Sequence, residues 1–419
     1  MDKRLAVQEN EKKKRVARLL SRAAGHLARG NHRYAARALY QALDADPQNA
    51  EIRRQLSEVL LDACEDWMVG GALGWEWTEK RLRSVIEPLQ PMLRSGQDVD
   101  TLKLLARIYE RFRRLDDAME ALRKALAAGG SRDPEVHALL GRLHMQRGNL
   151  DRARYSFERS LSLQPRYAPG MVGLAALEMQ KGEARAALLH LRGAVAADPR
   201  CTEAYCRLGE LYLYRFGNVK RASLMARQAL LLDPHDPMAR HLLGMVRYVS
   251  GDVEGAVAEW QKTVSGLNAY GPSLHTLADV SLEKEDYGGA RGYLERLLFA
   301  YPEDPEAKVK LGLASAALGD YFGASRLWEE ARRQSQDDGY SRVFLADLYA
   351  SLDRWDETWE LLGEALSLEL PPELDEQLRD LLLEAYAHCT LYEQAAYTVD
   401  KALQRYPDDP AILLAAALL

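Results

Sequence analysis

Glycines and histidines are the residues in this sequence whose spacing could support chemistry. Gly70, Gly71 and Gly74 are close enough to form a phosphate-binding loop, but no GxGxxG or GK[ST] pattern and no preceding strand accompanies them. His241 and His275 are 34 residues apart, yet no carboxylate or thiolate completes a metal-ligand set with them. The sequence therefore predicts no catalytic residue, no metal site and no cofactor, and favours a protein that is not an enzyme.

The cysteines point to structural thiols in a reducing compartment. Cys64, Cys201, Cys206 and Cys389 form no CxxC pair and no dense disulfide pattern. Cys201 and Cys206 are five residues apart, so they would share a helical face poorly. The first residues carry no secretory signal, and no run reaches the ~20 apolar residues of a membrane span. We therefore expect a cytoplasmic protein without a membrane span.

Composition and charge narrow the function classes. Of the 419 residues, 47% are apolar and 28% are charged, which excludes a largely disordered chain. The net charge of −6 predicts that nucleic acid is not a partner. Charge is also uneven, with +6 over residues 1–48 and −13 over residues 337–419. Charged side chains on a solvated surface explain the basic and the acidic segment separately. Their opposite charges would also allow end-to-end association between chains, which salt would screen.

A repeat of about 34 residues sets the elements that must position any functional side chain. Small residues recur in two parallel ladders whose steps are 34 or 35 residues. The first ladder consists of Ala106, Gly141, Ala175, Gly209, Gly244, Ala278, Gly312 and Ala346. The second ladder consists of Ala118, Ala153, Ala187, Ala222, Ala256, Ala290 and Ala324. Turn residues separate the ladders, and prolines close many of the units.

This pattern predicts pairs of amphipathic helices. Each unit reads as two helices of about a dozen residues that are joined by a Gly or Asp turn. Small residues let two helix backbones approach closely, and large residues such as Phe157, Trp260 and Trp328 fill the space behind them. One hairpin cannot bury its apolar face alone, so we expect the units to stack around a shared core.

The pattern resembles the tetratricopeptide repeat family over residues 16–49 and 99–409. The resemblance implies an all-α fold, a right-handed α-solenoid of stacked helix-turn-helix repeats. It also implies protein interaction rather than chemistry. The expected organisation is a charged N-terminal segment (1–15), one repeat (16–49), an irregular tryptophan-rich helical hairpin (50–98), eight repeats (99–372), a looser repeat (373–409) and an apolar C-terminal helix or cap (410–419).

The resemblance also implies a concave groove that is lined by the first helix of each unit. Charged residues mark one end of the groove at Lys103, Arg107, Glu110 and Arg142, and Asp347, Asp380 and Glu384 mark the other. The apolar, methionine-rich middle predicts a protein partner that offers an apolar or amphipathic segment. Superhelical curvature could instead cover some of these positions. The predicted partner-binding residues are Met145, Val172, Met179, Leu213, His241, Met245, Tyr248, His275 and Leu282, with Cys206 on the same face.

Two further segments carry partner predictions. Trp67, Trp75 and Trp77 either pack locally or form a second partner surface, because aromatic residues dominate interface hot spots. Residues 411–419 contain no charged side chain, so one face of that helix stays apolar after it covers the array. That face predicts docking against another subunit, against a partner, or against further sequence if the chain is truncated, and the alternative is a short cap.

The functional expectation follows from the repeat and from the lack of a catalytic constellation. We expect a protein–protein interaction scaffold or adaptor that binds a partner segment in its groove within a cytoplasmic assembly. The alternative is a regulatory subunit that controls an enzyme or transcription complex through the same groove.

Overall fold

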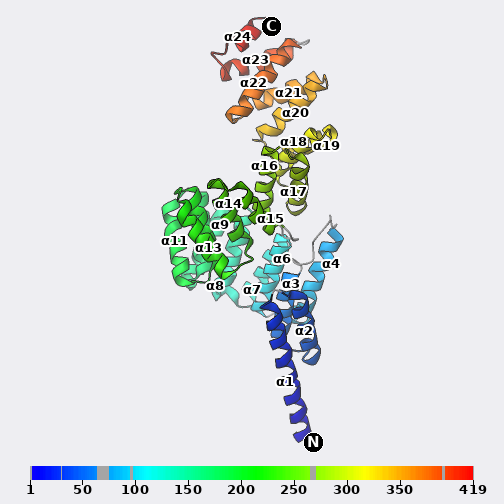
Figure 1. The fold of residues 1–419 in the computed structure, drawn as a ribbon, viewed down its shortest axis with the longest axis vertical. Coiled ribbons are helices and arrows are strands. Elements are labelled where there is room, and N and C mark those ends of the chain that lie inside the picture. The colour runs from blue at the N-terminus through cyan, green and yellow to red at the C-terminus, as the bar shows by residue number, and fades with distance from the viewer. Residues whose placement is uncertain are drawn as a thin grey trace. The chain divides into compact units, whose positions relative to one another are not determined.

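The structure is a computed structural model that describes residues 2–29, 31–63, 75–94, 98–264, 270–388 and 392–418. Every regular element within these ranges is a helix (Figure 1). No helix there is both long enough and apolar enough to cross a bilayer. The helices are α1 (Asp2–Leu27), α2 (His32–Ala45), α3 (Ala50–Ala63), α4 (Trp75–Ile86), η1 (Glu87–Leu89), α5 (Gln90–Leu93), α6 (Val99–Arg111), α7 (Leu115–Ala127), η2 (Gly130–Arg132), α8 (Pro134–Gln146), α9 (Leu150–Leu163), α10 (Ala168–Gln180), α11 (Ala184–Ala197), α12 (Thr202–Tyr214), α13 (Val219–Leu232), α14 (Pro237–Val249), α15 (Val253–Thr263), α16 (Gly271–Glu283), α17 (Tyr287–Ala300), α18 (Pro305–Ala317), α19 (Tyr321–Gln334), α20 (Gly339–Ser351), α21 (Trp355–Ala365), α22 (Pro372–Ala387), α23 (Tyr392–Arg405) and α24 (Pro410–Leu418).

The chain divides into two compact units, Met1–Tyr270 (unit 1) and Gly271–Leu419 (unit 2). Within each unit, successive helices pair as hairpins, such as α8 with α9 in unit 1 and α18 with α19 in unit 2. Each hairpin then contacts the next one along the chain. The expected fold class, an all-α solenoid of stacked helix-turn-helix repeats, is confirmed.

The small-residue ladders let the two helices of each hairpin approach closely. Every alanine of the second ladder is fully buried. A Cβ atom added to Gly141 would lie 2.6 Å from the Phe157 ring, and one added to Gly312 would lie 2.3 Å from the Trp328 ring. Trp328 is also fixed in orientation, because its Nε1 donates to the Val309 carbonyl at 3.0 Å. Large aromatic residues therefore occupy the space that the small residues leave.

A residue with left-handed backbone geometry recurs in the turns inside the described hairpins of the regular repeats. Gly148, Gly251 and Gly319 take left-handed φ values of 73°, 87° and 85°. Where the repeat lacks glycine at this position, Glu285 and Asp353 take the same conformation with a φ of 57°. The repeat therefore sets the turn geometry, although non-glycine residues in it carry a strain of about 1–2 kcal/mol.

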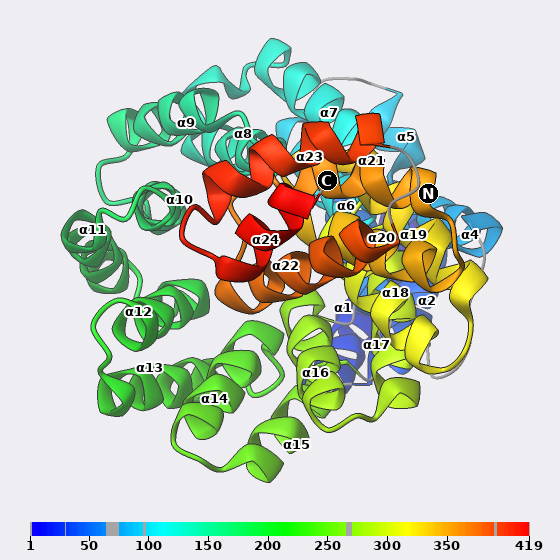
Figure 2. The same cartoon turned by 90° about the horizontal axis from the view of Figure 1, so that it is seen from above.

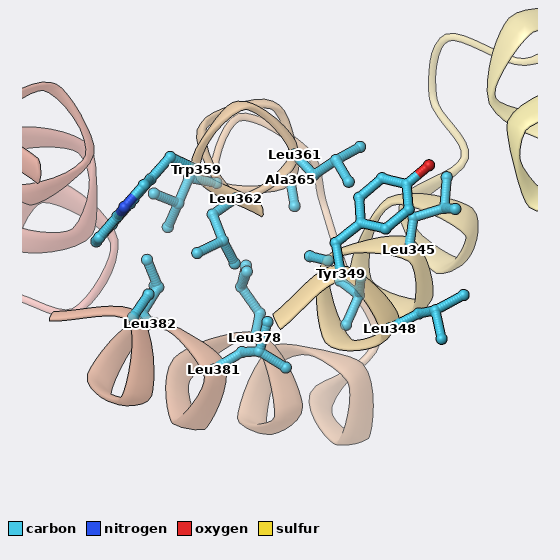
Figure 3. Close-up of a cluster of buried hydrophobic side chains, with 14 of the residues drawn as sticks. Leu345, Leu348, Tyr349, Trp359, Leu361, Leu362, Ala365, Leu378, Leu381 and Leu382 are labelled. Atoms are coloured by element: carbon cyan, nitrogen blue, oxygen red, sulfur yellow. The ribbon is translucent and has the colours of Figure 1, made fainter. Parts of the chain in front are cut away.

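The core of unit 2 shows how neighbouring hairpins share apolar residues. Side chains from α20, α21 and α22 converge in one cluster (Figure 3). Leu362 of α21 and Leu378 of α22 are fully buried there, and Trp359 lies beside Tyr386 with ring centroids 5.4 Å apart. Removing one hairpin would therefore expose apolar surface on its neighbour.

Residues 50–98 depart from the regular hairpin. Helix α3 is followed by the shorter α4, and Pro88 and Pro91 lie in the first turns of η1 and α5. Proline is tolerated at these positions because the first backbone N–H groups of a helix have no intrahelical acceptor. Leu89, between the two prolines, is fully buried and joins the core of the following repeat.

The last helix, α24, covers the end of the unit 2 core with one face. Ile412 is fully buried against that core. Leu413, Leu414 and Leu418 on the same helix are 46%, 62% and 78% exposed. The predicted apolar outer face is therefore present within the described residues.

Candidate partner-binding face

The first helices of the repeats in unit 1 form its inner face. Figure 2 shows α8, α10, α12 and α14 on the inner side of the curve and α9, α11 and α13 on its outer side. Consecutive inner helices contact one another, as α8 contacts α10 and α12 contacts α14. Because the small-residue ladder of each inner helix faces its hairpin partner, the opposite side of that helix is left for a ligand.

An ion network fixes one end of this inner face. The Lys103 side chain is only 9% exposed, and its Nζ lies 2.7 Å from Asp133 and 2.8 Å from Glu135. Asp100 on the same helix is 2.9 Å away. Burial lowers the pKa of Lys103, but hydrogen bonds to these carboxylates outweigh burial and leave the pKa raised. Lys103 therefore stays charged and ties α6 to the start of α8.

A second ion pair lies further along the same two helices. Arg142 of α8 donates from Nε and Nη2 to the two carboxylate oxygens of Glu110 of α6, at 2.7 and 2.6 Å. Gln146 adds a third hydrogen bond to Glu110 at 2.8 Å. A planar guanidinium held by two parallel hydrogen bonds has little freedom to rotate. The structure therefore brings these predicted groove residues together from neighbouring repeats.

The predicted apolar residues of unit 1 divide into two groups. Met145, Met179, Met245 and Tyr248 are half-buried and keep part of their surface accessible. Val172, Leu213 and His241 are buried, with exposed fractions of 2%, 6% and 9%, and Cys206 is fully buried. The buried group can support the inner face but offers little area to a ligand.

Helix α12 adds a charged pair that the sequence reasoning missed. Arg207 and Glu210 lie 3.0 Å apart, and burial raises the pKa of Glu210 although Arg207 opposes that shift. The repeat register could have predicted the position of Glu210, because this residue directly follows the ladder residue Gly209. The predicted groove residues Arg107 and Arg142 follow their ladder residues in the same way. The inner face of unit 1 thus combines half-buried methionines with fixed charges.

His241 is held in an aromatic environment. Its ring centroid lies 5.4 Å from that of Tyr270 and 6.2 Å from that of Trp260. Burial lowers the pKa of His241 to about 4, so the ring is neutral near pH 7. This histidine therefore acts as an aromatic core residue and does not present a charge to a ligand.

In unit 2 the predicted groove residues lie on α16, α20 and α22. His275 of α16 hydrogen-bonds the Asp304 carboxylate at 3.0 Å, and Leu282 is half-buried. Asp347 of α20 and Glu384 of α22 are exposed. Desolvation raises the pKa of Asp347, and the negative charge of Glu384 adds to that shift. This end of the chain therefore offers acidic side chains.

A separate cleft of about 1130 Å³ opens between α19, α21 and α23 of unit 2. Arg332 and Arg342 line it, and both hold Glu364, at 2.6 and 2.8 Å. Trp359 and Lys401 also line this cleft. Because Arg332 and Arg342 already contact carboxylates, these two arginines give the cleft no strong preference for an anion.

No three histidine, cysteine or carboxylate groups are placed to hold a metal ion within the described ranges. Burial is the main cause that raises the pKa of Cys201 and of Cys206, so both are protonated thiols near pH 7. Trp67 lies outside the described residues. The side chains of Trp75 and Trp77 do as well, so the possible second partner surface stays a prediction.

A comparison of the sequence with models of known protein families finds a matching family. The tetratricopeptide repeat model matches residues 103–168, 211–272 and 275–324. This chain carries tetratricopeptide repeats. These matched segments contain most of the ion pairs and methionines of the inner face described above.

The tetratricopeptide repeats are also shared with characterised relatives. Protein CTR9 homolog of Arabidopsis thaliana is 23% identical over 250 residues, which cover 57% of this chain and 23% of that protein. BBSome complex member BBS4 of Bos taurus is 22% identical over 283 residues, which cover 65% of this chain and 54% of that protein. The chain therefore spans about half the length of BBS4 and less than a quarter of the CTR9 homolog.

One solved structure is similar along nearly the whole chain. In the crystal structure of the APC/C hetero-tetramer Cut9–Hcn1, a chain is 12% identical with a TM-score of 0.46, and the match covers 96% of both chains.

Proposed function

We propose that this protein is a non-enzymatic interaction scaffold that binds an apolar or amphipathic segment of a protein partner on the inner face of its repeats. The observation that carries the proposal is the inner face of unit 1, whose helices carry the half-buried Met145, Met179 and Met245 together with charges fixed in ion pairs. Methionine adapts its shape to apolar ligands, and the charges can fix the register of a bound segment. We place this activity in a cytoplasmic assembly.

A named relative supports the scaffold role at the level of the family. BBS4 is a member of the BBSome complex, so that protein is a subunit of an assembly. A scaffold needs a rigid array with an accessible face, and the ladders of small residues supply that rigidity here.

The second candidate is a regulatory subunit that controls an enzyme or a transcription complex through the same face. The two roles use the same residues and differ in the partner. Quantitative pull-down from native lysate separates them, because a regulatory subunit would enrich one catalytic partner and a scaffold would enrich several subunits of one assembly.

The inner face is tested by replacing its accessible apolar residues. We expect Met179→Glu, Met245→Glu and Tyr248→Glu together to reduce capture of the partner at least about tenfold, since burying an unpaired carboxylate opposes binding. Circular dichroism must stay helical. Because these side chains are half-buried, Met179→Gln with Met245→Gln serves as a milder second variant.

A control variant places a new glutamate away from the inner face of unit 1. Phe322 of α19 is 82% exposed, so Phe322→Glu should fold normally and capture the partner as wild type does. Full capture by a folded inner-face variant would exclude this face as the binding site.

A further inference from the structure

The outer face of unit 1 is strongly basic. Helices α9, α11 and α13 follow one another along the outer side of the curve (Figure 2). Together they carry eight arginine and lysine side chains and only two carboxylates, in a chain whose net charge is −6. Within the described part of the chain, none of these eight cations forms an ion pair with a carboxylate. The positive charge is therefore available to a ligand.

Some of these cations are held in place by neutral groups. Arg192 of α11 donates to the Tyr212 hydroxyl at 3.3 Å, and the guanidinium of Arg221 lies 5.4 Å from the centre of the same ring. A tyrosine orients an arginine without neutralising it. This arrangement contrasts with the inner face, where Arg142 is paired with a carboxylate.

A ladder of exposed apolar side chains runs across the same three helices. Tyr155, Leu189 and Leu224 each follow a buried small residue of the repeat by two positions. Their exposed fractions are 69%, 71% and 52%. The equivalent positions of the flanking repeats are Glu120 in α7 and Ala258 in α15. Large apolar residues therefore occupy this position where the outer helices are basic.

We propose that the outer face of α9, α11 and α13 docks peripherally on an anionic lipid surface. Arginine and lysine close to such a surface each contribute to the attraction, and protruding leucine and tyrosine side chains can enter the boundary between headgroups and acyl chains. Leu231 at the end of α13, which is 76% exposed, extends the apolar set. The long arginine side chains keep their charge at the headgroups while their stems cover apolar surface.

The combination of charge and ladder favours lipid over other polyanions. A nucleic acid backbone would pair with the cations but gains little from exposed leucines. A protein partner would need recesses that match three separate protruding side chains, whereas a bilayer admits such side chains singly. Because this site lies on the outer face, the proposal of lipid docking can be tested independently of partner binding on the inner face.

Vesicle co-sedimentation of the full chain tests the proposal. We expect binding to phosphatidylcholine vesicles that contain roughly 30% phosphatidylserine, little binding to phosphatidylcholine alone, and loss of binding as salt rises. Leu189→Glu should weaken binding at least about tenfold, because it places a carboxylate where an apolar side chain enters the interface. Leu189 is mostly exposed, so the variant should keep the melting temperature of wild type.

Charge variants give an independent readout. Arg185→Glu, Arg192→Glu and Arg227→Glu together should abolish vesicle binding. The matched triple variant Arg291→Glu, Arg326→Glu and Arg333→Glu changes arginines of unit 2 that lie near glutamates and should leave binding unchanged. If Leu189→Glu does not fold, this pair of triple variants decides the question.

Three outcomes would overturn the proposal. The first is no binding to phosphatidylserine vesicles at low salt. The second is binding that depends on the arginines but not on Leu189, with equal affinity for duplex DNA or polyglutamate, which would indicate a general polyanion site. The third is equal loss of binding in both triple variants, which would place the contact elsewhere.

Discussion

At the scale of single residues, the burial of His241 makes the stability of the fold depend on pH. Its folded pKa of about 4 lies below the value of about 6.5 expected in the unfolded chain. As the pH falls through this range, the unfolded chain binds the proton first, so the folded state loses stability between about pH 6.5 and pH 4. With about 1.4 kcal/mol for each pKa unit, the loss attributable to His241 approaches ~3 kcal/mol.

The variant His241→Phe removes this titration and keeps an aromatic ring between Trp260 and Tyr270. We expect its free energy of unfolding to fall less than that of wild type between about pH 7 and pH 4, by up to ~3 kcal/mol. Urea denaturation at a series of pH values measures the difference. Parallel losses in the two proteins would show that His241 titrates normally in the folded state.

At the scale of helices, the ladder glycines set how closely the two helices of a hairpin approach. The Gly312→Ala change places a Cβ atom 2.3 Å from the Trp328 ring, and that ring is held by its hydrogen bond to Val309. We expect Gly312→Ala to lower the free energy of unfolding by about 1–3 kcal/mol through overpacking. Urea denaturation of the variant and of wild type gives this difference.

Gly292 is the matched control on α17. An added Cβ atom meets nothing within 4 Å there, and alanine favours the helix over glycine by about 0.5–1 kcal/mol. Gly292→Ala should therefore be neutral or stabilising. Similar effects of the two alanine variants would mean that the hairpin can relax around Trp328 and that close approach is not what requires the glycine.

At the scale of the whole molecule, the outer face of α24 predicts self-association. Leu414 and Leu418 are exposed and carry no charged neighbour on their own helix. We expect wild type to show a mass by light scattering that rises with concentration, and Leu414→Glu with Leu418→Glu to shift it toward that of one chain. Ile412 remains in place in this variant, so the core beneath should stay intact.

The control for this prediction is Leu352→Glu, which places a charge on another exposed leucine of unit 2. It should leave the mass as in wild type. If the variant of α24 also has the mass of wild type, the helix serves only to cover the end of the array.

The repeat and its pairs of stacked helices followed from the sequence pattern, and the expected inner face followed from the resemblance to the tetratricopeptide repeat family. Ladder residues such as Gly141 and Ala153 recur at a fixed period, and a period of 34 residues with small and large positions admits few arrangements other than stacked helix pairs. The predicted position of Glu110 and Arg142 on a shared face also follows from that register, and the structure joins them by two hydrogen bonds. Local periodicity is therefore sufficient for the repeat and for the pairs of helices.

Only the tertiary structure decided which inner-face residues stay accessible. Register gives the direction of a side chain on its helix, but it does not give the distance between neighbouring repeats. Val172 and Leu213 point in the expected direction and are nevertheless buried, because adjacent inner helices pack closely around them. Met179 and Met245, in the same cluster, keep accessible surface. Likewise, ion pairing is a property of neighbours in space, so only the structure shows that Arg142 is neutralised and Arg227 is not.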